Sequence, residues 1–490
     1  QANADARRTD LSSQLSGSSA ELVRIEDGLW KTYPRFMELT SPRPVTVDDL
    51  QGRLLREGEV LLSYVLLPQE TVVFAVTRDR LRMVTLPVKR EDIAGRVYVV
   101  RQTIDKVANG ESVLFLRRVE PYVLNSLYRD LVAPVADLLE GRGKVIVVGD
   151  GPLHIIPFEL FVVRFGTTDQ QAFRIARDKS DGSTEHPFLI EYASLEYLGK
   201  TQRFAYLPSL SALASQRLYP KPQTQRAQEL VAFADPDFTP QARTGRGIGA
   251  STRAMLDALG VASGRDGVPV IPLLRETADE AKEIATILGG SNLIHSGDRA
   301  QERLAKFGEL KGARYVLFAT HGFLGGEYLP AAETLPEGAV PPAMRAPHRS
   351  LAQPALALTL VGDLQGEDGM LTMKEVIEDI ELNADLVALS ACNTAGESAQ
   401  ANNGEGFAGL TRAFMFAGAR SLLVSHWSVD NLSTQALMTA TFRNIRGGQS
   451  VLSAVSEAQR RMIDARYANG PFHFSRGHPF FWAPFVFVGD

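Results

Sequence analysis

The stretch ADLVALSACNTAGES, residues 384–398, contains Cys392, the only cysteine in the chain of 490 residues. Four apolar residues, Leu386 to Leu389, come just before it, and Gly396 follows within four positions. A short apolar run bounded by small residues is typical of a fully buried strand. The stretch therefore predicts a strand of a parallel sheet that ends close to the thiol.

A second apolar run has the same form. The segment YVLFATHG, residues 315–322, leads directly into His321 and Gly322. In sheets of parallel strands, functional residues collect just beyond the carboxyl ends of the strands. We therefore expect the imidazole of His321 and the thiol of Cys392 to lie at one edge of the sheet, within reach of each other.

The surrounding sequence predicts an α/β fold. From residue 269 onward, strand-like runs alternate with helical patterns, which favours a mainly parallel sheet covered by helices on both faces, an αβα sandwich. The expected strands are 292–297, 315–322, 355–362, 385–392, 421–429 and 483–490. The expected helices are 276–288, 298–310, 371–381, 405–417, 431–445 and 449–466.

The first half of the chain has a different pattern. Runs at 59–67, 71–79 and 81–88 predict a small antiparallel sheet, and residues 21–40 predict a helix interrupted at Pro34. The polar, Ser-rich residues 1–20 are expected to form a frayed arm, and the segments 165–187 and 239–267 are expected to be exposed loops. We divide the chain into an N-terminal helical arm and linker (1–52), a smaller α+β regulatory lobe (53–225) and a catalytic lobe (226–490).

Composition excludes several classes of function. The net charge is −5 and no basic block stands out, so nucleic acid is not an expected partner. The chain has no apolar run long enough to cross a membrane, and a single cysteine fits a reducing, cytoplasmic setting. The absence of HExxH, CxxC and Walker-type patterns predicts that no metal, nucleotide or other cofactor is required.

The pair of strand ends has a chemical interpretation. A thiol is a weak nucleophile at its ordinary pKa, and a neighbouring imidazole makes the thiolate accessible near neutral pH. Cys392 would attack a carbonyl, and His321 would donate a proton to the leaving group. The backbone N–H groups of Gly322 and Cys392 could form an oxyanion hole, which Gly322 helps because it has no Cβ.

A structural interpretation of the same residues stays open. A single cysteine after an apolar run is more often a core residue than a nucleophile, and a lone His-Gly is equally unspecific. The joint pattern, with the histidine upstream of the cysteine, favours catalysis. It matches the chain order of caspases, although the caspase signature around the cysteine is absent here.

The motifs resemble one protein family over residues 55–490. The chain is similar to the CHAT family, caspase-like cysteine proteases that are related to separase and are widespread in bacteria. The resemblance rests on FATHG (318–322), SACNTAGE (390–397), GEGFAGLTRAFMFAGARSLLVSHWSVD (404–430), VVGDGPLHIIPFELF (147–161), AYLPSLSAL (205–213), LLRETADEAKEIATIL (273–288) and TVVFAVTRDRLRMVTLPVKREDI (71–93). It implies a caspase-like fold and a clan CD endopeptidase with His321 and Cys392 as the dyad.

The resemblance also implies a specificity pocket. In separase-like relatives an acidic residue near a tryptophan binds a basic P1 side chain, and Asp430 and Trp427 occupy the similar positions here. The separase pattern has a further Asp directly after the Trp, where this chain has Ser428. The alternatives are that Asp430 caps the following helix and that Trp427 fills the core.

Three functions remain as hypotheses. The first is an endopeptidase that acts on protein substrates, cleaves after Arg or Lys and responds to an upstream helical-repeat domain or regulatory protein. The second is a catalytically silent interaction module with the same fold. The third is a hydrolase or acyltransferase that uses the dyad on a non-peptide carbonyl.

Overall fold

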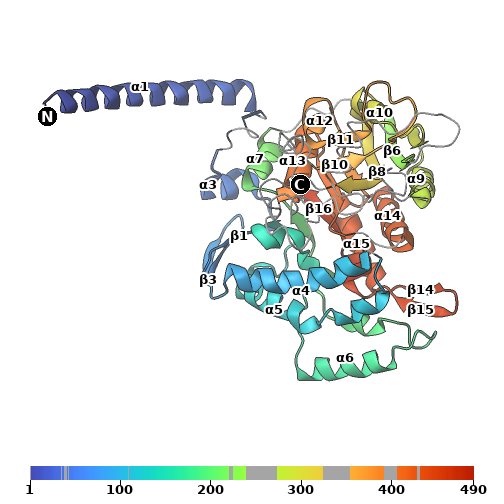
Figure 1. Cartoon of the computed structure of the whole chain (residues 1–490). Helices are drawn as coiled ribbons and strands as arrows, with labels where there is room; N and C mark the ends of the chain where they lie inside the picture. Colours follow the sequence, from blue (N-terminus) through green and yellow to red (C-terminus); the bar gives the residue numbers. More distant parts are fainter. Residues whose placement is uncertain are drawn as a thin grey trace, which may run out of the picture.

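The computed structural model shows a mixed α/β protein with a long N-terminal helix that extends away from the body (Figure 1). It describes residues 2–34, 36–37, 41, 43–108, 110–219, 225–238, 273–323, 354–390, 405–427 and 431–490.

In the described part of the chain, one sheet of eleven strands runs through the body, in the order β3-β2-β1-β4-β5-β16-β13-β12-β8-β6-β7. The small antiparallel sheet predicted for the first half is the β1–β3 end of this large sheet. The strands are β1 (Glu59–Leu66), β2 (Thr71–Val76), β3 (Leu81–Leu86), β4 (Lys144–Val148), β5 (Phe204–Tyr206), β6 (Gln228–Pro236), β7 (Asn292–Gly297), β8 (Ala313–Ala319), β12 (Leu386–Leu389), β13 (Ser421–Ser425) and β16 (Phe485–Gly489).

The half of the sheet that carries the predicted dyad is mainly parallel. β7, β6, β8, β12 and β13 pair in parallel with their neighbours, and β16 adds an antiparallel strand beside β13. Every residue of β12 and β13 is buried, as expected for strands covered on both faces. The α/β fold with a mainly parallel sheet, predicted from the sequence, is confirmed.

Helices complete the layers. They are α1 (Ala2–Thr32), α3 (Val47–Asp49), α4 (Arg90–Ala108), α5 (Pro121–Leu131), α6 (Thr167–Lys179), α7 (Leu210–Leu218), α9 (Arg275–Leu288), α10 (Glu302–Lys306), α12 (Met373–Glu378), α13 (Glu405–Ala417), α14 (Asn431–Arg446), α15 (Val451–Asp464) and α16 (Pro479–Trp482). α9 packs on α14, α14 packs on α15, and α12 packs on α13.

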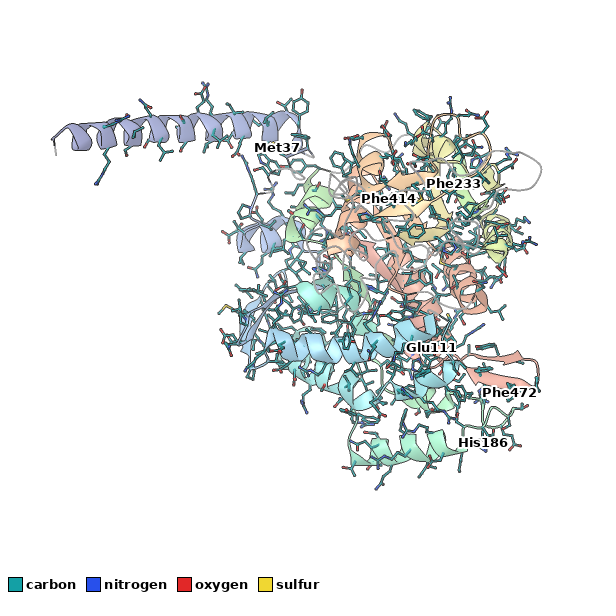
Figure 2. The ribbon with its side chains drawn as sticks, viewed as in Figure 1. Met37, Glu111, His186, Phe233, Phe414 and Phe472 are labelled. Carbon is teal, nitrogen blue, oxygen red and sulfur yellow. The ribbon has the colours of Figure 1, made fainter. Side chains whose placement is uncertain are left out.

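Two aromatic contacts of β8 show that α14 and α13 lie on opposite faces of the sheet. Side chains alternate between faces along a strand, so Tyr315 and Phe318 point in opposite directions. The ring centroid of Tyr315 lies 5.8 Å from that of Phe442 on α14, and that of Phe318 lies 5.7 Å from that of Phe414 on α13. Phe233 of β6 pairs in register with Phe318 and stacks on it, on the α13 side. Figure 2 labels Phe233 and Phe414 of α13. The C-terminal half of the molecule is therefore a three-layer sandwich.

Two local predictions were wrong, and one strand was not predicted. Residues 2–20 belong to the continuous helix α1, and the segment predicted as a loop at 165–187 contains α6. α6 has a single buried apolar residue, Phe173, which packs edge-on against Tyr192, and most of its other residues are polar, as is typical of an exposed loop. The sequence interpretation also missed β6.

His478 joins the two halves of the molecule. Its ring is 0 % exposed, and its Nε2 contacts the carbonyl oxygen of Leu116 at 3.1 Å while its Nδ1 accepts the backbone N–H of Phe480 at 3.0 Å. The Tyr192 ring packs edge-on against it, and the Tyr192 hydroxyl also donates to Leu116. Both ring nitrogens have a set role, so the imidazole is held neutral, and burial lowers its pKa to about 3.

This pKa shift predicts how acid acts on the protein. The unfolded chain binds a proton at His478 near pH 6.5 and the folded chain only near 3, so the folding stability that His478 contributes is lost as the pH falls between these values. We expect His478→Gln to weaken the pH dependence of the urea unfolding midpoint in this window. The control is His186→Gln, at a half-buried site. Equal pH dependence in both variants and the wild type would contradict the prediction.

Within the described ranges, no helix combines the length and apolarity that crossing a bilayer requires.

Candidate active site at the carboxyl edge of the sheet

His321 lies where the chain leaves the large sheet. β8 ends at Ala319, and His321 begins β9 (His321–Phe323), which belongs to a separate three-stranded sheet with β10 (Ala355–Ala357) and β11 (Met370–Thr372). His321 and Gly322 pair with Ala357 and Leu356 of β10. The backbone on both sides of the imidazole is therefore held by strand pairing.

Two further contacts fix this corner. The buried hydroxyl of Thr320 donates to the carbonyl oxygen of Ala357, which joins the turn between β8 and β9 to the small sheet. The half-buried ring of His321 packs beside Phe238, with 5.4 Å between the ring centroids. One side of the imidazole is thus packed against the end of the β6 segment.

The register of β8 and β12 relates His321 to the predicted nucleophile. Phe318 pairs with Leu389 in parallel, and each strand continues three residues to reach His321 or Cys392. Cys392 lies outside the described residues, which end at Ser390 on this segment. Within the described residues, Phe318 and Leu389 form the last pair between the two strands, so both strands end at the same edge of the sheet. The dyad itself stays a prediction.

Of the two predicted pocket residues, the structure describes Trp427 but not Asp430. Trp427, two residues beyond β13, is 1 % exposed, and its indole N–H donates to the carbonyl oxygen of Phe480 at 3.0 Å. The guanidinium of Arg101, from α4, lies 5.1 Å from the centre of the Trp427 ring. Asp430 lies outside the described residues. Trp427 is therefore a buried contact between the two halves of the molecule, beside the segment that leads to Asp430.

The edge next to His321 is acidic. Asp235 is the second-last residue of β6 and Asp237 follows the strand directly, and the next residue, Phe238, packs against His321. Burial and the neighbouring carboxylates raise the pKa of both groups, with Asp237 acting on Asp235, and Asp298 acting on Asp237. Asp235 has a positive φ of 47°, an uncommon conformation for a residue with a side chain. A cationic side chain placed near this edge would be stabilised.

A buried lysine, Lys306, holds the three-stranded sheet of β9, β10 and β11 in place through ion pairs. Lys306 Nζ lies 2.5 Å from a carboxylate oxygen of Glu302 and 2.7 Å from one each of Glu367 and Glu375. Glu302 also accepts the backbone N–H of Gly369, just before β11, and Glu375 caps α12. One ammonium group thus links α10, the turn before β11 and α12, and so supports the sheet that carries His321.

The same three glutamates have the spacing of a cation site, since their ligand oxygens lie within 4.8 Å of one another. The Lys306 ammonium forms an ion pair with each of the three, so the cluster already has an internal counter-ion. Burial raises the pKa of Glu302 to about 8 in spite of this contact, because its carboxylate is almost wholly removed from water. The donor set does not indicate a metal.

We expect Lys306→Met to destabilise the protein by about 3–5 kcal/mol, because it leaves Glu302 buried without its cation. Lys311→Met is the matched control. It breaks the exposed Lys311–Glu381 pair and should change the free energy of unfolding by about 1 kcal/mol or less. Urea unfolding of both variants measures the difference. Similar small losses in both would show that Lys306 does not anchor the small sheet.

Comparison with known proteins assigns the family. The model of the CHAT domain matches residues 122–490, which is more than half of the chain. The chain belongs to the CHAT domain family. It is also 28% identical to tetratricopeptide repeat protein 28 of Homo sapiens over 121 residues, 25% of this chain and 4% of that protein, and the Mus musculus protein matches to the same extent. The chain thus spans a small fraction of these relatives.

Two solved structures are similar in outline. The Saccharomyces cerevisiae separase–securin complex covers 90% of this chain and 30% of that chain, with 10% identity and a TM-score of 0.44. The Arg-specific cysteine proteinase gingipain R covers 82% of this chain and 74% of that chain, with 9% identity and a TM-score of 0.35.

The sequence interpretation missed several residues near this edge. The run LVAFA, residues 230–234, followed by Asp-Pro-Asp, has the strand and turn signals that would have predicted β6 and its acidic end. Arg101 gave no such signal, because its importance lies in its contact with Trp427, far away in the chain.

Proposed function

We propose that this CHAT protein is a cysteine endopeptidase with His321 and Cys392 as its dyad. The observation that supports the proposal is the parallel register of β8 and β12, in which Phe318 and Leu389, each three residues before a member of the proposed dyad, lie opposite each other. A free thiol nucleophile also fits the reducing, cytoplasmic setting expected from the single cysteine.

In the proposed reaction, the Cys392 thiolate attacks the carbonyl carbon of the scissile peptide bond. The carbonyl oxygen becomes an oxyanion that accepts hydrogen bonds from the backbone N–H groups of Gly322 and Cys392. His321 gives its proton to the nitrogen of the departing amine, and a thioester with Cys392 remains. Water then hydrolyses the thioester, which releases the carboxylic acid and restores the thiol.

We propose a basic P1 residue, Arg or Lys. The acidic end of β6, with Asp235 and Asp237 beside the His321 contact, supports a cationic substrate. Asp430 would pair with the P1 side chain, in a bidentate manner for Arg. Because Trp427 is buried, we propose that it packs behind the wall of the pocket and does not contact the P1 side chain.

The regulatory lobe, residues 53–225, is proposed to act on this pocket through α4, because Arg101 lies directly over Trp427. The tetratricopeptide repeat relatives support an upstream helical-repeat domain or partner protein as the source of regulation. The same relatives favour a second candidate function, an interaction module without turnover. The presence of both His321 and Cys392 favours the enzyme.

The test uses a pair of fluorogenic peptides that differ only in Arg or Asp at P1. We expect cleavage of the Arg peptide by the wild type, and a loss of at least about 10³-fold in kcat for Cys392→Ala and for His321→Ala, because each removes a reacting group. Asp430→Asn should raise KM for the Arg peptide with a smaller effect on kcat. His473→Ala, at a half-buried site on a hairpin, is the control.

Cleavage of the Asp peptide alone would support the protease activity but contradict the proposal that Asp430 binds a basic P1 side chain. Arg cleavage that survives in Cys392→Ala would contradict the dyad. No cleavage by a folded wild type, with or without added partner protein, would favour the interaction module.

A further inference from the structure

Helix α1 has a stripe along one side that is almost wholly apolar. Its positions recur in alternating steps of four and three residues, and they are Leu11, Leu15, Ser18, Leu22, Ile25 and Leu29. With 3.6 residues per turn, all six lie within about 40° of one line along the helix. This spacing is the heptad repeat of a coiled coil, with Leu15, Leu22 and Leu29 at a positions and the others at d positions. We call these six residues the α1 seam.

The α1 seam is uncovered over most of its length. Every residue from 11 to 25 is exposed, and Figure 1 shows α1 projecting from the body. The exposed fraction is 58 % for Leu11, 70 % for Leu15, 57 % for Leu22 and 51 % for Ile25. Single exposed apolar residues are normal on a protein surface, whereas a contiguous row of them marks an interaction site.

The helix also has little stability of its own. Residues 11–20 contain five serines and one glycine, and both residue types are weak helix formers. Isolated helices are marginal in water, and most helical stability in proteins comes from the packing of an apolar face. Because residues 11–25 are all exposed, nothing in the described part of the chain supplies this packing. A helix in this place therefore needs a partner along the α1 seam.

The α1 seam is complementary to an antiparallel copy of itself. When two such helices run in opposite directions, each a position of one helix lies opposite a d position of the other. The layers are then Leu11 with Leu29, Leu15 with Ile25, and Ser18 with Leu22. Each layer occurs twice about a two-fold axis, as in a closed symmetric dimer, and each contains at least one large apolar side chain.

The flanking charges favour this direction. Glu21 is at a g position and Glu26 at an e position, on either side of the seam. In a parallel dimer a g residue faces the next e residue of the other helix, so Glu21 would face Glu26 twice, and like charges repel. In the antiparallel pair Glu26 lies opposite Ser12. Glu21 then meets its own copy at the axis, where Arg24, 3.8 Å from the Glu21 carboxylate, offsets the repulsion.

The attachment of α1 also fits an antiparallel pair. The helix joins its body at its C-terminal end, where Trp30 is 8 % exposed, and its other end is free (Figure 1). Antiparallel helices place the two bodies at opposite ends of the pair, so the bodies do not compete for the same space.

We propose that α1 is a dimerisation helix, through which two copies of this chain associate in an antiparallel two-stranded coiled coil. The α1 seam spans fewer than three heptads, so we expect a reversible dimer with a Kd of about 1–100 µM. The inference does not rest on the proposed function, because the seam contains none of the residues of the candidate active site.

Sedimentation equilibrium of the full chain across this concentration range measures the association. The wild type should pass from the mass of one chain to that of two. Leu22→Glu puts a carboxylate into two apolar layers and should weaken the dimer at least about 100-fold. The matched control is Val23→Glu, because Val23 is also 57 % exposed but lies outside the seam. This variant should associate like the wild type.

A second pair of variants tests the seam by strengthening it. Ser18→Leu fills the single polar position and should tighten the dimer by about 10-fold or more. Ser13→Leu makes the same exchange on the opposite side of the helix, so it has the same effect on helix propensity and should leave the Kd unchanged. If Leu22→Glu does not fold, this second comparison decides the question, and equal Kd values for the two leucine variants would overturn the proposal.

Disulfide cross-linking tests the direction. Chains with Ser18→Cys are mixed with chains with Leu22→Cys, both without the natural thiol of Cys392. The antiparallel pair predicts a disulfide between the two kinds of chain and none within either kind alone. Linking of each kind to itself would show a parallel pair and contradict the proposal.

Two results of the sedimentation experiment would also overturn it. A wild type that stays monomeric throughout the range would leave the α1 seam to a helix of another protein. Equal weakening by Leu22→Glu and Val23→Glu would show that the dimer does not depend on the seam.

Discussion

The parallel pairing of β8 with β12 is the constraint on which the candidate site depends. With Phe318 opposite Leu389, the Phe318 ring reaches α13, Ser390 faces α9, and both strands leave the sheet together. A slip of one residue in either strand would turn every side chain of that strand to the other face. Apolar burial on both faces therefore holds the register of β8 and β12. This register fixes where β8 ends and so where His321 leaves the large sheet.

Buried polar contacts join the two halves around this core. His478 binds the carbonyl of Leu116, and Arg101 covers Trp427 while it pairs with Asp105 at 3.0 Å. Breaking one partner of such a contact leaves a charge or a dipole without water, so the halves are coupled in geometry as well as in stability. The large sheet also runs through both halves. Because Arg101 of α4 contacts Trp427, a movement of α4 would displace the chain just beyond β13.

Charge is distributed unevenly between the support of the site and its edge. Lys306 is the shared counter-ion of the three glutamates that hold the small sheet of β9, β10 and β11 in place. Asp235 and Asp237 are only part-buried, and a neighbouring carboxylate raises the pKa of each, Asp237 for Asp235 and Asp298 for Asp237. The support is thus compensated within the protein, whereas the edge favours a positive charge brought by a ligand.

The sequence by itself determined the α/β class, most strands of the parallel sheet and the edge at which His321 lies, because apolar runs and the residues that end them are local signals. It did not reveal β6, nor α6, which is mostly polar and buries a single ring. Only the tertiary structure placed Arg101 over Trp427 and Lys306 among three carboxylates. These side chains acquire their roles from burial and from partners distant in the chain, and no local pattern records which groups packing will bring together.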